Sequence, residues 1–311
     1  MNYLGVDIGG TNVRYGLVSA AGEILSSSHF LVRSERGFER VIKDITEHFK
    51  EFIAAIPAGA RPKGVAIGVA GRISPQTGSV IYSPNLPDWR NVPLAARVQE
   101  ALGLEVRIEN DANLYALGEW LAGAGRGLNN LVVITLGTGV GGGLILNGKL
   151  WTGSFDNAAE IGHMVVEPDG KPCKCGGTGC LETLASGTAM AQQAKEWIQN
   201  GEPCGYKGNL EYLTSADLFD LARQGDTLAL KVFDKAGTSL GLALTNVFNI
   251  LGLEGAIIGG GAGLVFDFLK PKILKELAER VFTVDVDKIT LVRAALGDSA
   301  PLVGAPTLFK Q

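Results

Sequence analysis

The feature that most constrains the fold is a repeated pair of apolar strands joined by a glycine- and threonine-containing turn. Residues 3–8 form an apolar run that ends in Gly9-Gly10-Thr11, and residues 13–18 form a second run. About 128 residues later, residues 131–136 lead through Gly137-Thr138-Gly139 into another apolar strand. Short apolar runs bounded by such turns are typical of hairpins. The repeat therefore predicts two related halves, each containing a strand hairpin.

The glycine turns are candidate phosphate sites, because successive backbone N–H groups can surround an anion. A third turn, Gly259-Gly260-Gly261, follows an apolar strand at 256–258 and precedes a predicted helix at 266–281. A single strand that ends in glycines is usually only a turn, but three such turns favour a ligand that approaches the backbone. The stretch 137–142 resembles G-x-G-x-x-G yet leads into a strand, and no Walker pattern is present, so a Rossmann dinucleotide site is disfavoured.

Three of the four cysteines lie within eight positions, ten residues after a histidine. His163, Cys173, Cys175 and Cys180 offer one imidazole and three thiolates, the ligand types that zinc prefers. Four unrelated buried residues are the alternative, which this clustering disfavours. A zinc ion held by four protein ligands has no open position, so we expect it to be structural. Cys204 lies outside the cluster.

Two further segments allow a structural and a functional interpretation. Residues 106–110 read as a strand followed by a helix to about residue 122, which places Asp111 at the junction, where it could be a helix cap or a reactive carboxylate. The segment 83–89, with two prolines and Asn85, could shape a loop or line a sugar pocket. The residues alone leave both alternatives open. Helical patterns at 37–55 and 91–102 alternate with strands at 64–69 and 104–108, which predicts an α/β first domain.

Composition excludes several classes of protein. The 311 residues are 46% hydrophobic and 19% charged, with a net charge of −4, which is typical of a folded chain long enough for two domains. The absence of a long basic run argues against nucleic acid as a partner. Neither a signal peptide nor an apolar run of membrane-spanning length is apparent, so we expect a cytoplasmic protein with reduced thiols and no membrane contact.

Five motifs together resemble the ROK family of repressors, open reading frames and sugar kinases. They are Asp7-Ile8-Gly9-Gly10-Thr11 with Arg14, Asn110-Asp111-Ala112-Asn113, Gly137-Thr138-Gly139, Glu160-x-Gly162-His163, and Cys173-x-Cys175-Gly176-x-x-Gly179-Cys180-x-Glu182. The resemblance implies an α/β fold of the actin-like, hexokinase-like (ribonuclease H-like) type, with two domains around a central cleft. We expect a small domain of residues 1–113 plus about 297–311, and a large domain of 114–296 that carries the zinc loop.

The resemblance also implies a role for each matching position. Asp111 would be the general base, and Asp7 would help to hold Mg²⁺ through water. Further positions would contact Mg-ATP: Gly9, Gly10, Thr11, Gly137, Thr138 and Gly139 at the phosphates, and Gly260 and Gly261 beside the adenosine. The sugar would contact Asn85, Asn110, Asp111, Glu160, His163 and Glu182. His163 would use one ring nitrogen for zinc and the other for the sugar.

The ROK family includes both sugar kinases and transcriptional repressors. Repressors carry a helix-turn-helix segment ahead of the first hairpin, and Asp7 lies so near the start that we expect none here, which favours catalysis. Glucose phosphorylated by ATP is the expected reaction. N-acetylmannosamine and N-acetylglucosamine kinases are alternatives, fructose ranks below glucose, and a noncatalytic sugar-binding protein ranks last. Polyphosphate is an alternative donor. The family implies a homodimer or homotetramer.

One segment departs from the family pattern. Asp156 and Ala159 stand where kinases of this family commonly have glycine. Replacing glycine removes permissive backbone angles and adds bulk. We therefore expect the loop before Glu160 to be less flexible and the pocket to differ in shape.

Overall fold

The computed structural model describes residues 1–86 and 88–310 and contains two five-stranded mixed sheets of the same topology. The first has the order β3-β2-β1-β4-β8 and the second the order β11-β10-β9-β12-β13. Each pairs a hairpin with two parallel strands, so the duplication predicted from the glycine turns is confirmed. The strand bounds in the two sheets are β1 Asn2–Ile8, β2 Asn12–Ser19, β3 Ile24–Leu31, β4 Gly64–Val69, β8 Glu105–Asn110, β9 Leu131–Leu136, β10 Val140–Leu146, β11 Lys149–Leu150, β12 Gly255–Gly259 and β13 Thr290–Arg293.

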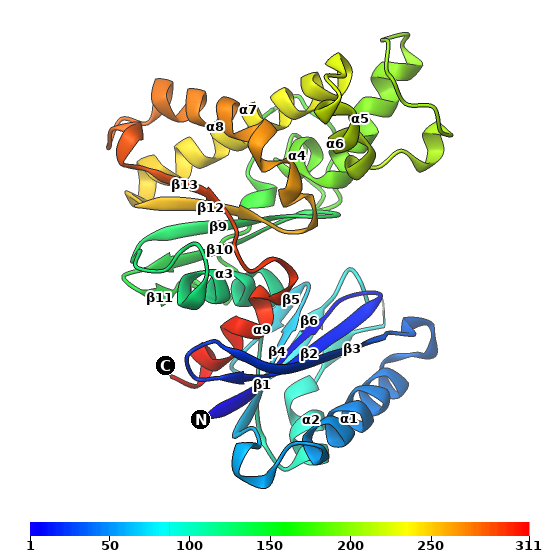
Figure 1. Cartoon of the computed structure of the whole chain (residues 1–311), viewed down its shortest axis with the longest axis vertical. Helices are drawn as coiled ribbons and strands as arrows, with labels where there is room; N and C mark the ends of the chain where they lie inside the picture. Colours follow the sequence, from blue (N-terminus) through cyan, green and yellow to red (C-terminus); the bar gives the residue numbers. More distant parts are fainter. Residues whose placement is uncertain (87, 311) are drawn as a thin grey trace.

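Helices form layers on both sides of these sheets (Figure 1). α1 and α2 cover the outer face of the first sheet, and the long α7 packs with α8 over the second. The helix bounds are α1 Phe38–Ala54, α2 Leu94–Leu102, α3 Asp111–Ala122, α4 Glu182–Ala185, α5 Gly187–Gln199, α6 Ser215–Arg223, α7 Thr227–Leu251, α8 Phe266–Arg280 and α9 Ala300–Gly304. Among the described residues, no helix is both long and apolar enough to cross a bilayer.

α3 and the C-terminal α9 lie between the two sheets (Figure 1). A separate buried cluster joins them: Leu114 and Leu117 of α3 and Ala300 of α9 pack with Val133 of β9 and Ile257 of β12. The chain returns through α9 to pack against β1, so its two ends lie near one another in Figure 1. The domain limits at residues 113 and 297 stay predictions.

The segment 72–92 forms a small sheet that the sequence did not predict. It contains β5 Arg72–Ser74, β6 Ser79–Tyr82 and β7 Arg90–Val92 in that order. The helix expected at 91–102 consequently begins only at Leu94. Asn91 has a left-handed backbone with φ 53°, and Pro93 is the N-cap residue, so neither continues a helix backwards. Pro87 of the predicted sugar segment lies outside the described residues.

Glu119 is a fully buried acid that fastens α3 to the chain entering α9. Its carboxylate accepts hydrogen bonds from three backbone N–H groups: Ala124 at 2.8 Å, Ala295 at 3.0 Å and Leu296 at 2.7 Å. Bonds to an ionised acceptor are stronger than neutral ones. The carboxylate thus ties together two segments that lie far apart in the sequence.

Replacing Glu119 by Ala is expected to lower the free energy of unfolding by about 3 to 5 kcal/mol, because three buried donors lose their acceptor. Urea denaturation measures this loss. Glu100→Ala on the exposed face of α2 is the control, and it should change stability by less than about 0.5 kcal/mol. A loss below about 1 kcal/mol for Glu119→Ala would mean that water replaces the carboxylate.

Candidate functional site

Asp111 is the first residue of α3, but Asn110 caps the helix. The Oδ1 atom of Asn110 accepts from the backbone N–H groups of Ala112 at 2.9 Å and Asn113 at 3.3 Å, and its Nδ2 donates to the carbonyl of Gly71 at 3.1 Å. The sequence left open whether Asp111 serves as a cap or as a reactive acid. Since the neighbouring amide does the capping, the Asp111 carboxylate is available for chemistry.

A second acid, Asp7, lies at the end of β1. Burial, together with the charge of Asp111, raises the pKa of Asp7 to about 7, although Arg14 lies 3.6 Å away and opposes the shift. Arg14 also bonds Asp298 at 2.8 Å, in the turn before α9. Burial likewise raises the pKa of Asp111, and the charge of Glu160 adds to that effect. The charge of Asp111 acts on Asp7 and the charge of Glu160 acts on Asp111, so this group of acids favours a cation.

The two hairpin turns carry the predicted phosphate-binding residues. Thr11 and Thr138 are exposed in the β1–β2 and β9–β10 turns. Gly10 fits closely against Asn85, since a Cβ on Gly10 would lie 3.1 Å from the Asn85 Cβ. Gly137 is open, with nothing within 4 Å of the position of a Cβ, so a ligand can approach its backbone.

The third glycine turn follows β12. Gly260 has φ 81°, and a Cβ there would lie 2.5 Å from the carbonyl oxygen of Leu136, at the end of β9. Only glycine fits this position. The turn therefore packs directly beside the strand that leads into Gly137.

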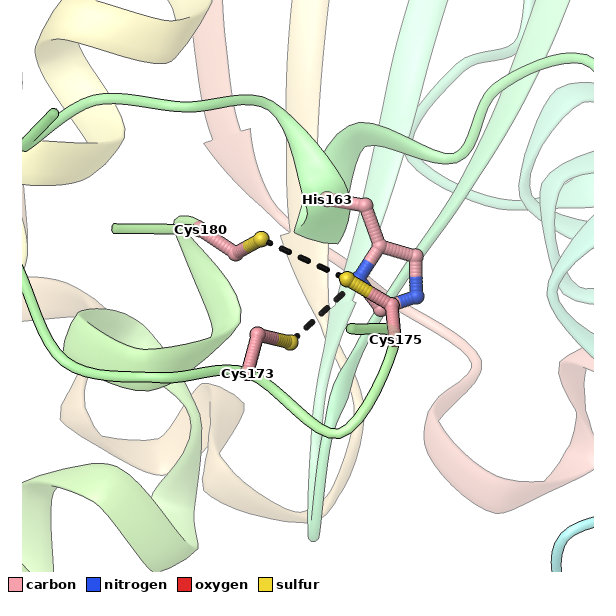
Figure 2. Close-up of side chains that lie close together, drawn as sticks. All are labelled: His163, Cys173, Cys175 and Cys180. Carbon is pink, nitrogen blue, oxygen red and sulfur yellow. Dashed lines mark hydrogen bonds between the residues drawn. The ribbon is translucent and has the colours of Figure 1, made fainter. Parts of the chain in front are cut away.

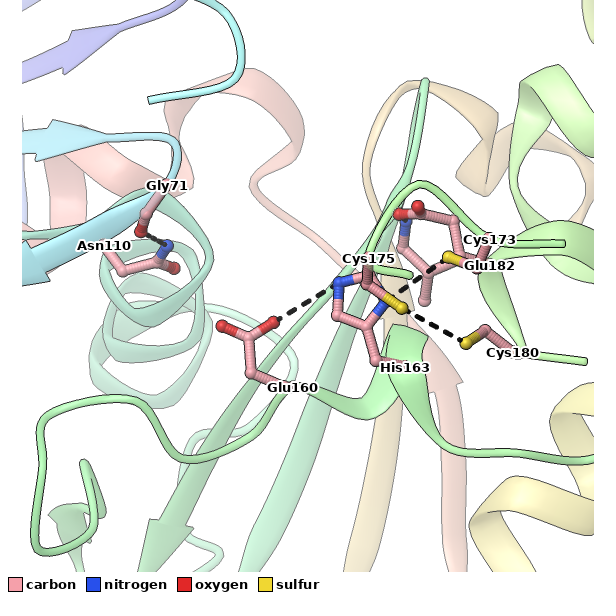
Figure 3. Close-up of polar contacts among 9 residues, drawn as sticks. Gly71, Asn110, Glu160, His163, Cys173, Cys175, Cys180 and Glu182 are labelled. Carbon is pink, nitrogen blue, oxygen red and sulfur yellow. Dashed lines mark hydrogen bonds and ion pairs between the residues drawn. The ribbon is translucent and has the colours of Figure 1, made fainter. Parts of the chain in front are cut away.

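Glu160, His163 and Glu182 lie around the cysteine cluster, with Asn110 on the neighbouring helix end (Figure 3). The Nε2 atom of His163 lies 3.9 Å from Oε2 of Glu160, and the other ring nitrogen faces the cysteines. One oxygen of Glu182 accepts from the backbone N–H of Val140 at 3.0 Å. Glu182 therefore also stabilises the β9–β10 turn, a contact that the sequence did not predict.

The four predicted zinc ligands converge (Figure 2). Their ligand atoms all lie within 4.8 Å of one another. Cys175 Sγ is 3.6 Å from Cys180 Sγ, and Cys173 Sγ is 3.7 Å from His163 Nδ1. Ligands at about 2.3 Å from zinc on a tetrahedron stand roughly 3.8 Å apart, so these separations fit the ion. Cys204 is not part of the cluster.

The loop before Glu160 has left-handed backbone at the two positions where the sequence departs from the family pattern. Asp156 has φ 54° and Ala159 has φ 65°, both in the left-handed region that favours glycine. Asp156 accepts a hydrogen bond from Thr152 at 3.3 Å, a local contact of the kind that helps Asp to adopt this conformation. Ala159 has no polar side chain to compensate.

Replacing Ala159 by Gly is expected to raise the free energy of unfolding by up to about 1 kcal/mol. Relief of roughly 1 to 2 kcal/mol of strain outweighs the extra freedom of glycine in the unfolded chain. The matched change Ala96→Gly, at an exposed position inside α2, should have the opposite sign and destabilise by about 1 kcal/mol. Equal losses in the two variants, measured by chemical denaturation, would contradict the assignment of strain.

Sequence reasoning missed the residues that connect the site to the rest of the molecule. Asp298 lies 284 positions from its partner Arg14, and the only sequence signal for it is its position in a Gly-Asp-Ser turn. Tyr115 and Glu119 follow Asp111 at four-residue intervals on α3, a spacing that puts them on one helix face. That spacing was a usable signal, although it does not reveal what each side chain contacts.

A family model, a relative and a solved structure all indicate the same family. The model of the ROK family matches residues 3–311. A Thermotoga maritima glucokinase is 38% identical over 100% of this chain and 98% of its own length. The structure of a Streptomyces griseus ROK glucokinase in complex with glucose and AMPPNP has a TM-score of 0.82, with 34% identity over 99% of both chains.

A ROK transcriptional regulator, a homologue of the E. coli MLC protein, also has this fold. It has a TM-score of 0.89 at 29% identity over 99% of this chain and 78% of its own. The fold therefore does not separate kinases from regulators, and the distinction depends on the site. The fold is the actin-like, hexokinase-like one. By its full-length match to the family model and its identity to the curated relatives, the chain belongs to the ROK family.

Proposed function

We propose that this protein is an ATP-dependent glucose kinase that forms glucose 6-phosphate, with Asp111 as the general base. The observation that carries the proposal is the buried carboxylate of Asp111: Asn110 caps α3 in its place, and the carboxylate interacts electrostatically with Glu160 and with Asp7. Full-length identity of 38% to a glucokinase supports the same activity.

The chemistry requires mainly positioning and charge neutralisation. The sugar hydroxyl gives its proton to the Asp111 carboxylate as its oxygen attacks the γ-phosphorus of ATP, and ADP leaves. Asp7 would help to hold Mg²⁺, and the cation would neutralise charge on the transferred phosphoryl group. Donors in the turns at Gly9 and Gly137, with the exposed Thr11 and Thr138, would hold the phosphates.

The proposed sugar contacts are carboxylates and amides. Glu160 has 63% of its side chain exposed and is free to accept from a pair of hydroxyls. Asn110 keeps one N–H after its bond to Gly71, and Glu182 keeps one oxygen after its bond to Val140. Asn85 and His163 would complete the set. We also propose that zinc fixes the loop that presents His163 and Glu182.

ADP release tests the proposal. The protein would be assayed with Mg-ATP against glucose, mannose, fructose, N-acetylglucosamine and N-acetylmannosamine. With polyphosphate in place of ATP no ADP forms, so the sugar phosphate would be measured instead. We expect glucose to be preferred and the activity to disappear in Asp111→Ala. Preference for an acetamido sugar would keep the mechanism and change the substrate. Failure to phosphorylate any sugar would favour a noncatalytic sugar-binding protein.

Two expectations from the resemblance stay predictions. A homodimer or homotetramer would appear in multi-angle light scattering as two or four times the chain mass of 32.7 kDa. The cytoplasmic location also stays a prediction, which fractionation of the source cells would test.

A further inference from the structure

α3 carries three polar side chains on one face, four residues apart. Asp111 stands at its start, Tyr115 one turn later and Glu119 one turn after that. Residues at this spacing project from the same side of a helix. Glu119 fixes the far end to the backbone of Ala295 and Leu296. The role of the middle residue is not explained by the chemistry at Asp111.

The Tyr115 hydroxyl contacts the glycine turn after β12. It accepts a hydrogen bond from the backbone N–H of Gly260 at 3.2 Å. A Cβ on Gly259 would lie 2.4 Å from the Tyr115 oxygen, so the turn rests directly on the hydroxyl. Tyr115 is only 6% exposed, and burial raises the pKa of its hydroxyl, which keeps it protonated at neutral pH.

The same turn is packed on its other side as well. Gly260 lies against the carbonyl of Leu136, the last residue of β9 before the β9–β10 turn. The β9–β10 turn is itself held to the start of α5, because the carbonyl of Gly137 accepts a hydrogen bond from the N–H of Gly187 at 2.8 Å. Tyr115 therefore connects the helix of the base with a glycine turn that itself contacts the end of β9. Only one helical turn, about 5.4 Å, separates Tyr115 from Asp111 along the axis.

We propose that Tyr115 is a positioning residue that couples the turn at Gly259–Gly261 to the start of α3, so that nucleotide and sugar strengthen each other's binding. The inference rests on the proposed function and on the expectation from the family resemblance that adenosine lies beside Gly260 and Gly261. A nucleotide that orders this turn also orders its bond to Tyr115, and through it the helix that presents Asp111. Thermodynamic linkage requires the coupling to be equal in both directions.

The Tyr115→Phe variant isolates the hydroxyl, because phenylalanine keeps the ring in the buried cluster. Calorimetry would measure the Kd of glucose with and without saturating Mg-AMPPNP, and the Kd of AMPPNP with and without glucose. In the unaltered protein each ligand should tighten the other. The coupling factor is the ratio of the Kd of glucose without nucleotide to its Kd with nucleotide. In Tyr115→Phe this factor should fall about three- to tenfold, which corresponds to the free energy of one hydrogen bond. The Kd of glucose without nucleotide should stay the same.

Tyr15→Phe is the matched control. Tyr15 is also a buried tyrosine, 4% exposed, but it packs among Phe30, Phe49 and Phe52 on the first sheet. It should leave the coupling factor unchanged. The same coupling in Tyr115→Phe as in the unaltered protein, or binding of both ligands with no coupling, would overturn this inference alone. No binding of either ligand by the unaltered protein would overturn the proposed function with it.

Discussion

Replacing Asp111 by Asn is expected to lower kcat for glucose phosphorylation by about 10²- to 10⁴-fold, the usual contribution of a placed general base. Asparagine has the same size, but it cannot take the proton of the sugar hydroxyl. The Kd of glucose should therefore change much less than kcat. Steady-state kinetics together with calorimetric titration of glucose separates the two quantities.

The control for Asp111→Asn is Asp220→Asn, the same chemical change on an exposed position of α6. It should leave kcat within twofold of the parent. A loss of less than about fivefold in Asp111→Asn would show that the carboxylate only orients the sugar. An equal loss of glucose affinity would assign Asp111 to binding rather than to proton transfer.

The pH profile provides an independent test of the same carboxylate. Burial, helped by the charge of Glu160, raises the pKa of Asp111 above its ordinary value of 3.8. A base must be deprotonated, so kcat should fall on the acid side through a pKa above that value. The residual activity of Asp111→Asn should lose the part of this acid limb that belongs to Asp111 and keep only the part due to Asp7, whose pKa burial also raises.

The raised pKa also fixes the sign of the effect on stability. An acid whose pKa is higher in the folded than in the unfolded chain contributes stability that is present below pH 3.8 and is lost as the pH rises through the folded pKa. At pH 7.5 the buried Asp111 carboxyl thus destabilises the ligand-free protein. Asp111→Asn should melt no earlier than the parent at this pH, which separates lost catalysis from lost folding.

Local patterns predicted those parts of the molecule that depend on neighbours in sequence. The hairpins end in glycine turns that can be read directly, and three of the zinc ligands lie within eight positions. Asp111 follows a recognisable strand. The small β5–β6–β7 sheet was missed because its strands are only three or four residues long. Short strands carry little periodicity.

Contacts across the whole fold could not be predicted in this way. Tyr115 is hydrogen-bonded to Gly260, which lies 145 positions away in the sequence, and Glu119 to Leu296, which lies 177 positions away. These pairs form only because α3 lies between the two sheets. Which residue caps α3 was also undecidable, since Asn110 and Asp111 are both good caps and only the geometry assigns the role to Asn110.

Removing the zinc is expected to weaken glucose binding by about 10- to 100-fold and AMPPNP binding by less than about threefold. Cys180 lies two residues before Glu182, and His163 lies three after Glu160, so the proposed ion fixes the side chains that would grip the sugar. None of the four zinc-ligating residues lies in the turns at Gly9 and Gly260. Among the described residues, only the hydrogen bond from Val140 to Glu182 connects the zinc loop to the β9–β10 turn, so the rest of the nucleotide site should keep its shape.

Cys180→Ser tests this selectively, with Cys204→Ser as the matched control because Cys204 lies outside the cluster. Metal analysis should find about one zinc per chain in the parent and in Cys204→Ser, and little in Cys180→Ser. Calorimetry then gives both affinities for each protein. If Cys180→Ser lost nucleotide and sugar binding equally, the cluster would support the whole fold rather than the sugar loop. Full activity in zinc-free protein would remove the ion from the mechanism, and the His163 ring would then have to be oriented by Glu160 alone.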